Sequence, residues 1–368
     1  MILEGQDLDY VVDQLSEYYG SFDRIDSYFR ERKKQRLDKL PPTLFSIEDD
    51  LFSDFSMSPE DMNFVLEDLP FSQWNNYLEY ISSHSNDINP GRTVPLAVKE
   101  TTTGKYVGFI RLGSPTINSK PRNVLFGGVP PLDKVNDHIM MGFVIVPTQP
   151  FGFNYLGGKL LALICASHEV REMLNKKYDC DICMFETTSL YGNIKAASQY
   201  DGLKPFIRYR GDTESKFLLT MSDKIYTEMN NFFQEKNGGP LIDHSASSRK
   251  LKTQTKMISI AKASLKQAGR DDDYKKFVGF LEKAQSLTTK KRSYTSEYGF
   301  ENAVDYIMGK DDKLIRKENY DRYYLDNLVE WWRNKATKRY NNLVSDGRLR
   351  TEMEIWNPEK MEEIDIIR

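Results

Sequence analysis

Four consecutive stretches of the chain decide its fold: IMMGFVIVP at 139–147, TQPFGFNYLGGKLLALICASHEVREMLNKKY at 148–178, DICMFETTS at 181–189 and LYGNIKAASQYDGLKPFIRYRG at 190–211. The first and third are short apolar runs typical of buried strands. The second carries apolar side chains at helical spacing after two adjacent glycines. The order predicts a strand, a helix and a strand, followed by a short helix over 192–202 and a last strand over 203–209.

Two further strands are predicted upstream, at 96–99 and 106–112, around the turn at 102–105. The predicted class is therefore α/β (α+β), with a mixed central sheet flanked by helices and helical extensions at both ends. Gly157 and Gly158 stand where the first strand passes into the helix. The free N–H groups of a first helical turn attract phosphate, and glycine lets a ligand approach the backbone. A plain tight turn is the alternative.

The segments 149–152, 157–161 and 193–200, followed by Gly202 and Leu203, resemble the GCN5-related N-acetyltransferase superfamily. The resemblance implies a core of this order of elements, with the pyrophosphate of an acyl-CoA such as acetyl-CoA at the start of the central helix. In this chain the compact loop of the superfamily is interrupted by residues 153–156.

Seven segments between residues 93 and 210 carry a closer resemblance, at 106–113, 120–123 with 127–128, 136–147, 156–163, 171–178, 185–188 and 191–202. They resemble the DruA-like proteins of Druantia anti-phage systems and mobile elements. Residues 186–203 are also similar to Mom, a DNA-modification protein of transposing phages. These resemblances imply a role on or near DNA for a phage-related or mobile-element protein.

Acyl transfer to an amine needs an oxyanion donor, a base for the ammonium proton and an acid for the leaving thiolate. Glu186, at the carboxyl end of its strand, is the candidate base, because partial burial raises a carboxyl pKa toward neutrality. A structural, salt-bridged carboxylate is the alternative. The resemblance implies Tyr200 as the acid, and Tyr191 is the second candidate for that role. The expected acyl-CoA site comprises Phe143, Val144, Val146, Gly157, Gly158, Lys159 and Asn193.

The composition is that of a folded protein, with 368 residues of which 39% are hydrophobic and 12% aromatic. No apolar run approaches the roughly 18 residues of a membrane span. The acidic N-terminus lacks the basic start and apolar core of a signal peptide. We therefore expect a cytoplasmic protein in a bacterial host, without a membrane partner. The spacing of Cys180 and Cys183, with no second pair or nearby histidine, predicts no metal site.

Charge is distributed unevenly around a net value of −3. The first 80 residues hold 18 acidic and 7 basic residues. This acidic region is interpreted as a helical layer over one edge of the sheet. The alternative is an acidic arm that mimics DNA or binds a protein partner. No acidic residue occurs between Asp243 and Asp271, where the apolar spacing predicts an amphipathic helix over 248–267. Its basic face can bind phosphate, or it can simply be solvated.

Nine cations are the candidate DNA contacts. Four lie in the basic helix, four follow a double tryptophan, where aromatic and basic residues alternate, and one precedes the central strand. They are Arg249, Lys250, Lys252, Lys256, Arg333, Lys335, Lys338, Arg339 and Arg122. The double tryptophan, Trp331 and Trp332, is equally suited to anchoring a helix in the core.

We expect four regions: an acidic helical region over 1–90, the core over 91–220, a basic helical region over 221–350 and an acidic tail over 351–368. Helices are predicted over 6–40, from Ser58 onward, and over 221–236.

The leading hypothesis is an acyltransferase-like protein that acts on or with DNA. A non-catalytic DNA-binding or assembly protein, and an N-acetyltransferase of proteins or small molecules, are the alternatives.

Overall fold

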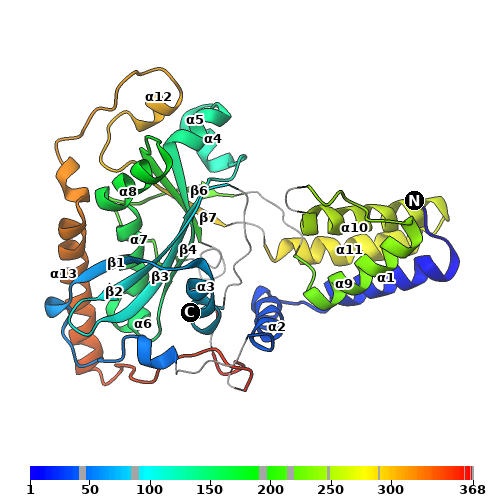
Figure 1. The fold of residues 1–368 in the computed structure, drawn as a ribbon, viewed down its shortest axis with the longest axis horizontal. Coiled ribbons are helices and arrows are strands. Elements are labelled where there is room, and N and C mark those ends of the chain that lie inside the picture. The colour runs from blue at the N-terminus through cyan, green and yellow to red at the C-terminus, as the bar shows by residue number, and fades with distance from the viewer. Residues whose placement is uncertain are drawn as a thin grey trace. The chain divides into compact units, whose positions relative to one another are not determined.

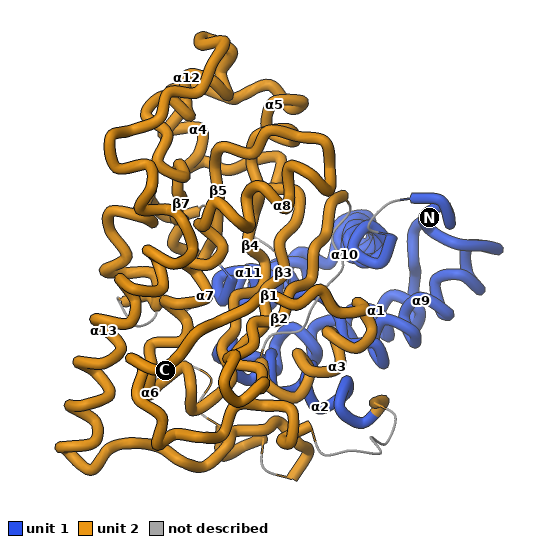
Figure 2. Tube along the Cα trace, turned by 60° about the vertical axis from the view of Figure 1, so that its left-hand side comes forward, with its two compact units in different colours: residues 1–38, 214–289 blue, residues 39–213, 290–368 orange. Residues whose placement is uncertain are grey.

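A computed structural model describes residues 1–40, 47–83, 91–189, 197–213, 219–246, 249–288, 291–359, 361–364 and 366. The chain forms two compact units, coloured separately in Figure 2. The helical unit comprises residues 1–38 and 214–289, and the sheet unit comprises residues 39–213 and 290–368. Most of the helical unit is thus an insertion into the sheet unit, completed by the N-terminal 38 residues. The sequence prediction placed its boundaries instead at residues 90, 220 and 350.

The described part of the sheet unit contains one mixed sheet in the order β1-β2-β3-β4-β5-β7-β6 (Figure 1). The strands are β1 (Phe64–Asp68), β2 (Thr93–Glu100), β3 (Lys105–Gly113), β4 (Ile139–Pro147), β5 (Met184–Ser189), β6 (Arg208–Asp212) and β7 (Arg292–Ser296). Neighbours are antiparallel except β4 and β5, which are parallel. The predicted mixed α/β class with flanking helices is confirmed.

Both faces of the sheet are covered. On one face the apolar side chains of β2, β3 and β4 pack against α7 (Gly157–Cys165), α8 (His168–Tyr178) and α13 (Leu325–Ser345). Trp332 of α13 is fully buried there, and its Nε1 donates to the Tyr155 carbonyl at 2.8 Å. On the other face a smaller cluster joins Phe109 and Val144 to Trp74 of α3 (Phe71–Ile81). The double tryptophan therefore contributes to the core through Trp332.

The described part of the sheet unit also contains four short helices near its strands. α4 (Lys120–Phe126) and α5 (Leu132–His138) connect β3 to β4, and α6 (Phe151–Tyr155) connects β4 to α7. The last, α12 (Ala303–Ile307), follows β7 and contacts both α4 and α5. Short 3₁₀ turns occur at Ile47–Asp50, Pro59–Asp61 and Tyr320–Tyr323.

The helical unit consists of α1 (Gly5–Gly20), α2 (Ile25–Leu37), α9 (Asp223–Asn237), α10 (Arg249–Gln267) and α11 (Asp271–Ser286). Buried tyrosines tie its two chain segments together, because the Tyr18 hydroxyl donates to the Thr220 carbonyl at 3.0 Å. Gln254 is fully buried and bridges the same segment, accepting from Met221 N at 2.8 Å and donating to the Leu219 carbonyl at 3.0 Å. The predicted helices over 221–236 and 248–267 are confirmed as α9 and α10.

Several sequence predictions fail where local pattern competes with tertiary packing. The single helix expected over 6–40 is divided into α1 and α2, and the central helix is divided at Ser167, whose side chain caps α8. The helix expected from Ser58 is a three-residue 3₁₀ turn, and the region after it contains the edge strand β1. The described residues 197–202 form a turn rather than the end of a helix, and the last strand starts only at Arg208.

The C-terminal segment is also not a free acidic tail. Trp356 is 3% exposed, and its amide donates to the Tyr80 carbonyl at 2.7 Å. The amide of Glu354 donates to the Gln149 carbonyl at 3.1 Å. Met353 and Ile355 pack against the cluster around Trp74, so apolar contacts hold this segment within the sheet unit.

Candidate active site

The central strand β4 carries a bulge near its middle. Val144 pairs with Arg111 and Gly142 pairs with Leu112, so Phe143 is the extra residue in the β3–β4 ladder. A bulge leaves one residue unpaired, bends its strand and increases the local twist. Phe143 is therefore the position at which β4 changes direction.

The parallel ladder between β4 and β5 ends beside this bulge. Its last pair is Gly142 with Thr187, and among the described strands the rest of β4 pairs with β3 alone. The backbones of Phe143, Val144 and Val146, which the sequence assigned to the cofactor site, all lie beyond this last pair. They occupy the part of β4 where β5 no longer follows it.

The start of α7 lies directly after this strand and the short α6. Leu156, the residue before the helix, has a positive φ of 55° and offers no side-chain hydrogen bond to cap it. The amides of Lys159 and Leu160 donate to the Leu156 carbonyl, at 2.9 and 3.2 Å, whereas those of Gly157 and Gly158 donate to none of the described residues. A Cβ on Gly157 would lie 2.7 Å from the ring of Phe151 and 2.9 Å from Pro147. Glycine is thus required here by close packing as well as being suited to a ligand.

A turn that includes Gln199 covers this helix start. A Cβ on Gly158 would collide with the side-chain oxygen of Gln199. Lys159 Nζ donates to the main-chain oxygens of Gln199, at 3.0 Å, and of Asp201. Burial lowers the pKa of Lys159, although Asp201 opposes the shift. The glycine and the lysine expected to receive a phosphate are therefore both engaged by the protein's own chain.

Asp201 fixes that turn to β7. Its carboxylate accepts from Ser198 N at 2.9 Å, Tyr294 Oη at 2.8 Å and Arg292 Nη1 at 2.8 Å. Burial opposes ionisation, but these hydrogen bonds and the Arg292 charge leave the pKa of Asp201 lowered. Sequence reasoning missed both residues. The side-chain partners of Asp201 belong to β7, which follows the insertion, and Gln199 contacts α7, about 40 residues earlier in the chain.

Glu186 of β5 is 5% exposed and forms a buried ion pair with Arg122 of α4, 3.1 Å between Oε2 and Nη1. Arg122 Nη2 also donates to the carbonyls of Thr116 and Ile117, each at 2.6 Å. Burial raises the pKa of Glu186, while Arg122 counteracts the shift. Oε1 of Glu186 has no hydrogen-bond partner among the described residues. The carboxylate thus combines a structural ion pair with one buried oxygen that is available as an acceptor.

Tyr200, the candidate acid, is 4% exposed, and burial raises its pKa to about 12 although Thr187 and Gln199 hydrogen-bond to it. Thr187 Oγ1 donates to the Gly142 carbonyl at 3.0 Å, at the last β4–β5 pair. Because consecutive strand residues point to opposite faces, Glu186 and Thr187 face different sides of the sheet. The structure therefore places Glu186 and Tyr200 on opposite faces of β5.

Two remaining candidates, Tyr191 and Asn193, lie outside the described residues. Among the described residues, no group of three His, Cys, Asp or Glu side chains could hold a metal ion. Cys165 and Cys183 are buried, and burial raises the pKa of each thiol. No helix within the described ranges is long and apolar enough to cross a membrane.

The cations of α13 are largely used within the sheet unit. Arg333 pairs with Glu330 and donates to the Met62 carbonyl at 2.9 Å. Arg339 donates to the Phe153 carbonyl at 2.7 Å, and burial lowers its pKa. Lys335 lies 4.6 Å from the ring of Trp331. Lys338 is exposed.

The predicted DNA contacts in the other regions differ in exposure. Arg122 is 1% exposed and is held by Glu186. Among the cations of α10, Lys250 pairs with Asp223 at 2.8 Å. Arg249 is partly buried, whereas Lys252 and Lys256 are exposed.

Comparison with known proteins gives one family match. The family described as Druantia protein DruA matches residues 72–278, more than half of the chain. The match begins in α3 and ends in α11, so it includes β4, α7, β5 and α10, while β7 lies beyond it. No curated protein matches the chain, and no solved structure matches it.

Proposed function

Because the chain belongs to the DruA family, we propose that it acts in anti-phage defence of the Druantia type, as a nucleic-acid-directed protein with an acyltransferase-like core. In this proposal the sheet unit transfers an acyl group from an acyl-CoA-type donor to an amine on DNA. The observation that carries the proposal is the bulge at Phe143 beside the end of the β4–β5 ladder at Gly142 and Thr187.

The residues present at the start of α7 fit a pyrophosphate in one respect and obstruct it in another. The amides of Gly157 and Gly158, which donate to none of the described residues, lie at the positive end of the helix dipole, which favours an anion. The Gln199 side chain, however, occupies the space above Gly158. We therefore infer that the Gln199 side chain moves aside when a cofactor binds. A bound acyl thioester would supply the activated acyl group.

The chain's own residues supply the proton chemistry in this proposal. Oε1 of Glu186, which has no hydrogen-bond partner among the residues described, can accept a proton from an amine, while Arg122 holds the other oxygen in place. Tyr200, with a pKa of about 12, stays protonated at neutral pH and can donate a proton. Since the two side chains face opposite sides of β5, Glu186 would act on the acceptor and Tyr200 on the leaving group.

Acetyl-CoA titration of the full chain by calorimetry tests cofactor binding. We expect binding that tightens about tenfold in Gln199→Ala, since removing a side chain that competes for the site removes its displacement cost. Lys159→Glu should weaken binding, because it places a negative charge at the helix start. Lys338→Glu is the matched control, since it makes the same charge change at an exposed position of α13. Absence of heat in both the native chain and Gln199→Ala would exclude an acyl-CoA site.

Mass spectrometry of nucleosides tests the acceptor. DNA incubated with the protein and acetyl-CoA should contain acetylated nucleosides, and Glu186→Gln should abolish them. Modification of added protein or amine instead of DNA would overturn the DNA assignment in favour of a protein or small-molecule N-acetyltransferase.

A second candidate is a non-catalytic DNA-binding or assembly protein that keeps this fold. The engagement of Gly158 and Lys159 by the Gln199 turn favours it. It predicts salt-sensitive DNA binding together with no response to acetyl-CoA in any variant.

A further inference from the structure

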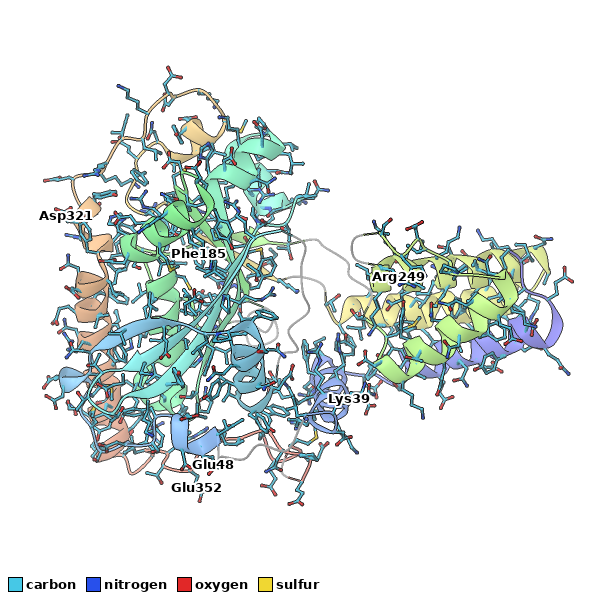
Figure 3. All side chains as sticks on the ribbon, viewed as in Figure 1. Lys39, Glu48, Phe185, Arg249, Asp321 and Glu352 are labelled. Atoms are coloured by element: carbon cyan, nitrogen blue, oxygen red, sulfur yellow. The ribbon has the colours of Figure 1, made fainter. Side chains whose placement is uncertain are left out.

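Helix α10 of the helical unit carries charged side chains of positive sign only. Its 19 residues, RKLKTQTKMISIAKASLKQ, include six Lys or Arg and no Asp or Glu. Figure 3 labels Arg249 at its first residue. The whole helix lies within the segment that matches the family.

One face of α10 is exposed along its entire length. Residues 252, 256, 259, 263 and 266 are all exposed, and 3.6 residues per turn place them in a single stripe. The opposite face carries Met257, Ala261 and Leu265, each 0% exposed. The stripe therefore consists of Lys252, Lys256 and Lys266 with two small residues between them, Ser259 and Ala263.

These three lysines differ from several other lysines of the helical unit in their lack of an acidic partner. Among the described residues, Lys252, Lys256 and Lys266 form no ion pair; Lys266 lies 4.8 Å from the ring of Tyr274. Three comparison lysines in the same unit each have an acidic partner: Lys236 with Asp7 at 2.7 Å, Lys275 with Asp272 at 3.9 Å and Lys283 with Asp23 at 2.5 Å. Within the described residues, the positive charge of the α10 stripe is thus not neutralised by an ion pair.

We propose that the exposed stripe of α10 binds the phosphate backbone of double-stranded nucleic acid without reading its sequence. Lysine acts as a point charge on phosphate, and the stripe offers no planar amide or guanidinium for base edges. The inference rests on the proposed nucleic-acid role, which it deepens by naming the surface, and it is independent of acyl transfer.

The length of the stripe suits a duplex. From Lys252 to Lys266 the helix rises about 21 Å at 1.5 Å per residue. Six base pairs rise about 20 Å at 3.4 Å each. The three lysines can therefore meet phosphates along roughly half a turn of DNA, with Ser259 and Ala263 small enough to let the helix approach closely.

Fluorescence anisotropy with a labelled random-sequence duplex tests the proposal, with salt varied from 50 to 200 mM. The variant Lys252→Gln/Lys256→Gln/Lys266→Gln removes three phosphate contacts. Its slope of log affinity against log salt should be shallower by about 2.7, since each contact contributes about 0.9. Across this salt range, the native chain should lose about 40-fold more affinity than the variant.

The matched control is Lys236→Gln/Lys275→Gln/Lys283→Gln, which changes net charge equally but removes lysines that already have acidic partners. It should leave the salt slope unchanged. Circular dichroism should show that both triple variants keep their helices, which is expected because the substituted residues are at the surface.

An equal loss of duplex affinity and an equal decrease of the salt slope in both triple variants would overturn the proposal, because binding would then depend on net charge and not on this stripe. Equally tight binding of poly-glutamate or of anionic vesicles to the native chain, weakened by the same α10 variant, would also overturn it in favour of another polyanion. The acetyl-CoA titration distinguishes a failure of the α10 proposal from a failure of the proposed acyl transfer. The α10 variant should bind acetyl-CoA like the native chain, whichever result the duplex measurement gives.

Discussion

The sheet unit buries Glu186 and Arg122 against each other, whereas the helical unit exposes Lys252 and Lys256, which have no acidic partner in the part of the chain that the structure describes. In the first case two charges leave water and depend on each other, so removing either leaves a costly buried charge. In the second case the charges keep their hydration and are free to meet an external anion, at the cost of strong sensitivity to salt. The comparison suits the sheet unit to chemistry that needs side chains held in fixed positions. It suits the helical unit to salt-dependent binding of an external anion.

The two units can be followed separately in one molecule. All four tryptophans, at positions 74, 331, 332 and 356, belong to residues 39–213 and 290–368 of the sheet unit. Tryptophan fluorescence therefore reports on the sheet unit alone. Far-ultraviolet circular dichroism reports on the helices of both units.

The largest effect is expected from Arg122→Met, which leaves Glu186 buried without its counter-ion. We expect the sheet unit to lose about 3–5 kcal/mol of unfolding free energy at pH 8, measured by urea titration with tryptophan fluorescence. Because burial raises the pKa of Glu186, its protonated form is favoured in the folded state. Stability from that form is present at low pH and is lost as pH rises through the folded pKa. The destabilisation should therefore be smaller at pH 5.

The double variant Arg122→Met/Glu186→Gln is the control, since it removes the buried charge and should recover part of the loss. A destabilisation that is equal at pH 5 and pH 8 would show that the cost arises from packing and not from the buried charge.

In the helical unit, Gln254→Ala should cost about 2–3 kcal/mol, because it leaves Met221 N and the Leu219 carbonyl without their buried partner. The loss should appear in the circular dichroism transition and leave the tryptophan transition in place. An equal shift of both transitions would break the comparison by showing that the units unfold together.

A pH effect specific to the sheet unit is expected from His168, which is 0% exposed and stacks on Tyr320. Burial lowers its pKa to about 4, so the folded state binds fewer protons than the unfolded state between about pH 6.5 and pH 4. The stabilisation is complete above pH 6.5 and is lost as pH falls. We expect a loss of about 2 kcal/mol between pH 7.5 and pH 5.

Tryptophan unfolding curves of the native chain and of His168→Gln measure the contribution of His168 to the pH dependence of stability. The variant should lose that contribution. His244→Gln alters an exposed histidine of the helical unit and should change nothing. Parallel pH profiles for all three proteins would contradict the assignment to His168.

The smallest effect is expected at the adjacent glycines. Gly157→Ala should cost about 1–2 kcal/mol, because the new methyl group meets the Phe151 ring and Pro147. Gly158→Ala meets only the far end of the flexible Gln199 side chain, so its melting temperature should stay near that of the native chain. Equal melting temperatures for both variants would show that Gly157 is not held by packing.

Much of the fold was predictable, because strands β2 to β5 and helices α9 and α10 each carry a periodic apolar pattern in their own sequence. The end of α9 is equally local, since two glycines follow Asn237 and Gly238 adopts the left-handed conformation that glycine favours at a helix end. Where the prediction failed, the signal was weak or non-local. β1 and β7 are five-residue strands whose place depends on the neighbours they pair with.

The sequence by itself determined the order of the central elements and the segregation of charge onto α10, because periodicity and local charge are properties of neighbouring residues. It also identified Glu186 and the two glycines as candidates. Only the tertiary structure decided that Arg122 faces Glu186, that β7 lies beside β5 and that Gln199 covers Gly158. Each of these contacts joins segments far apart in the chain, and the free energy that selects them comes from burial and pairing, which no single segment contains.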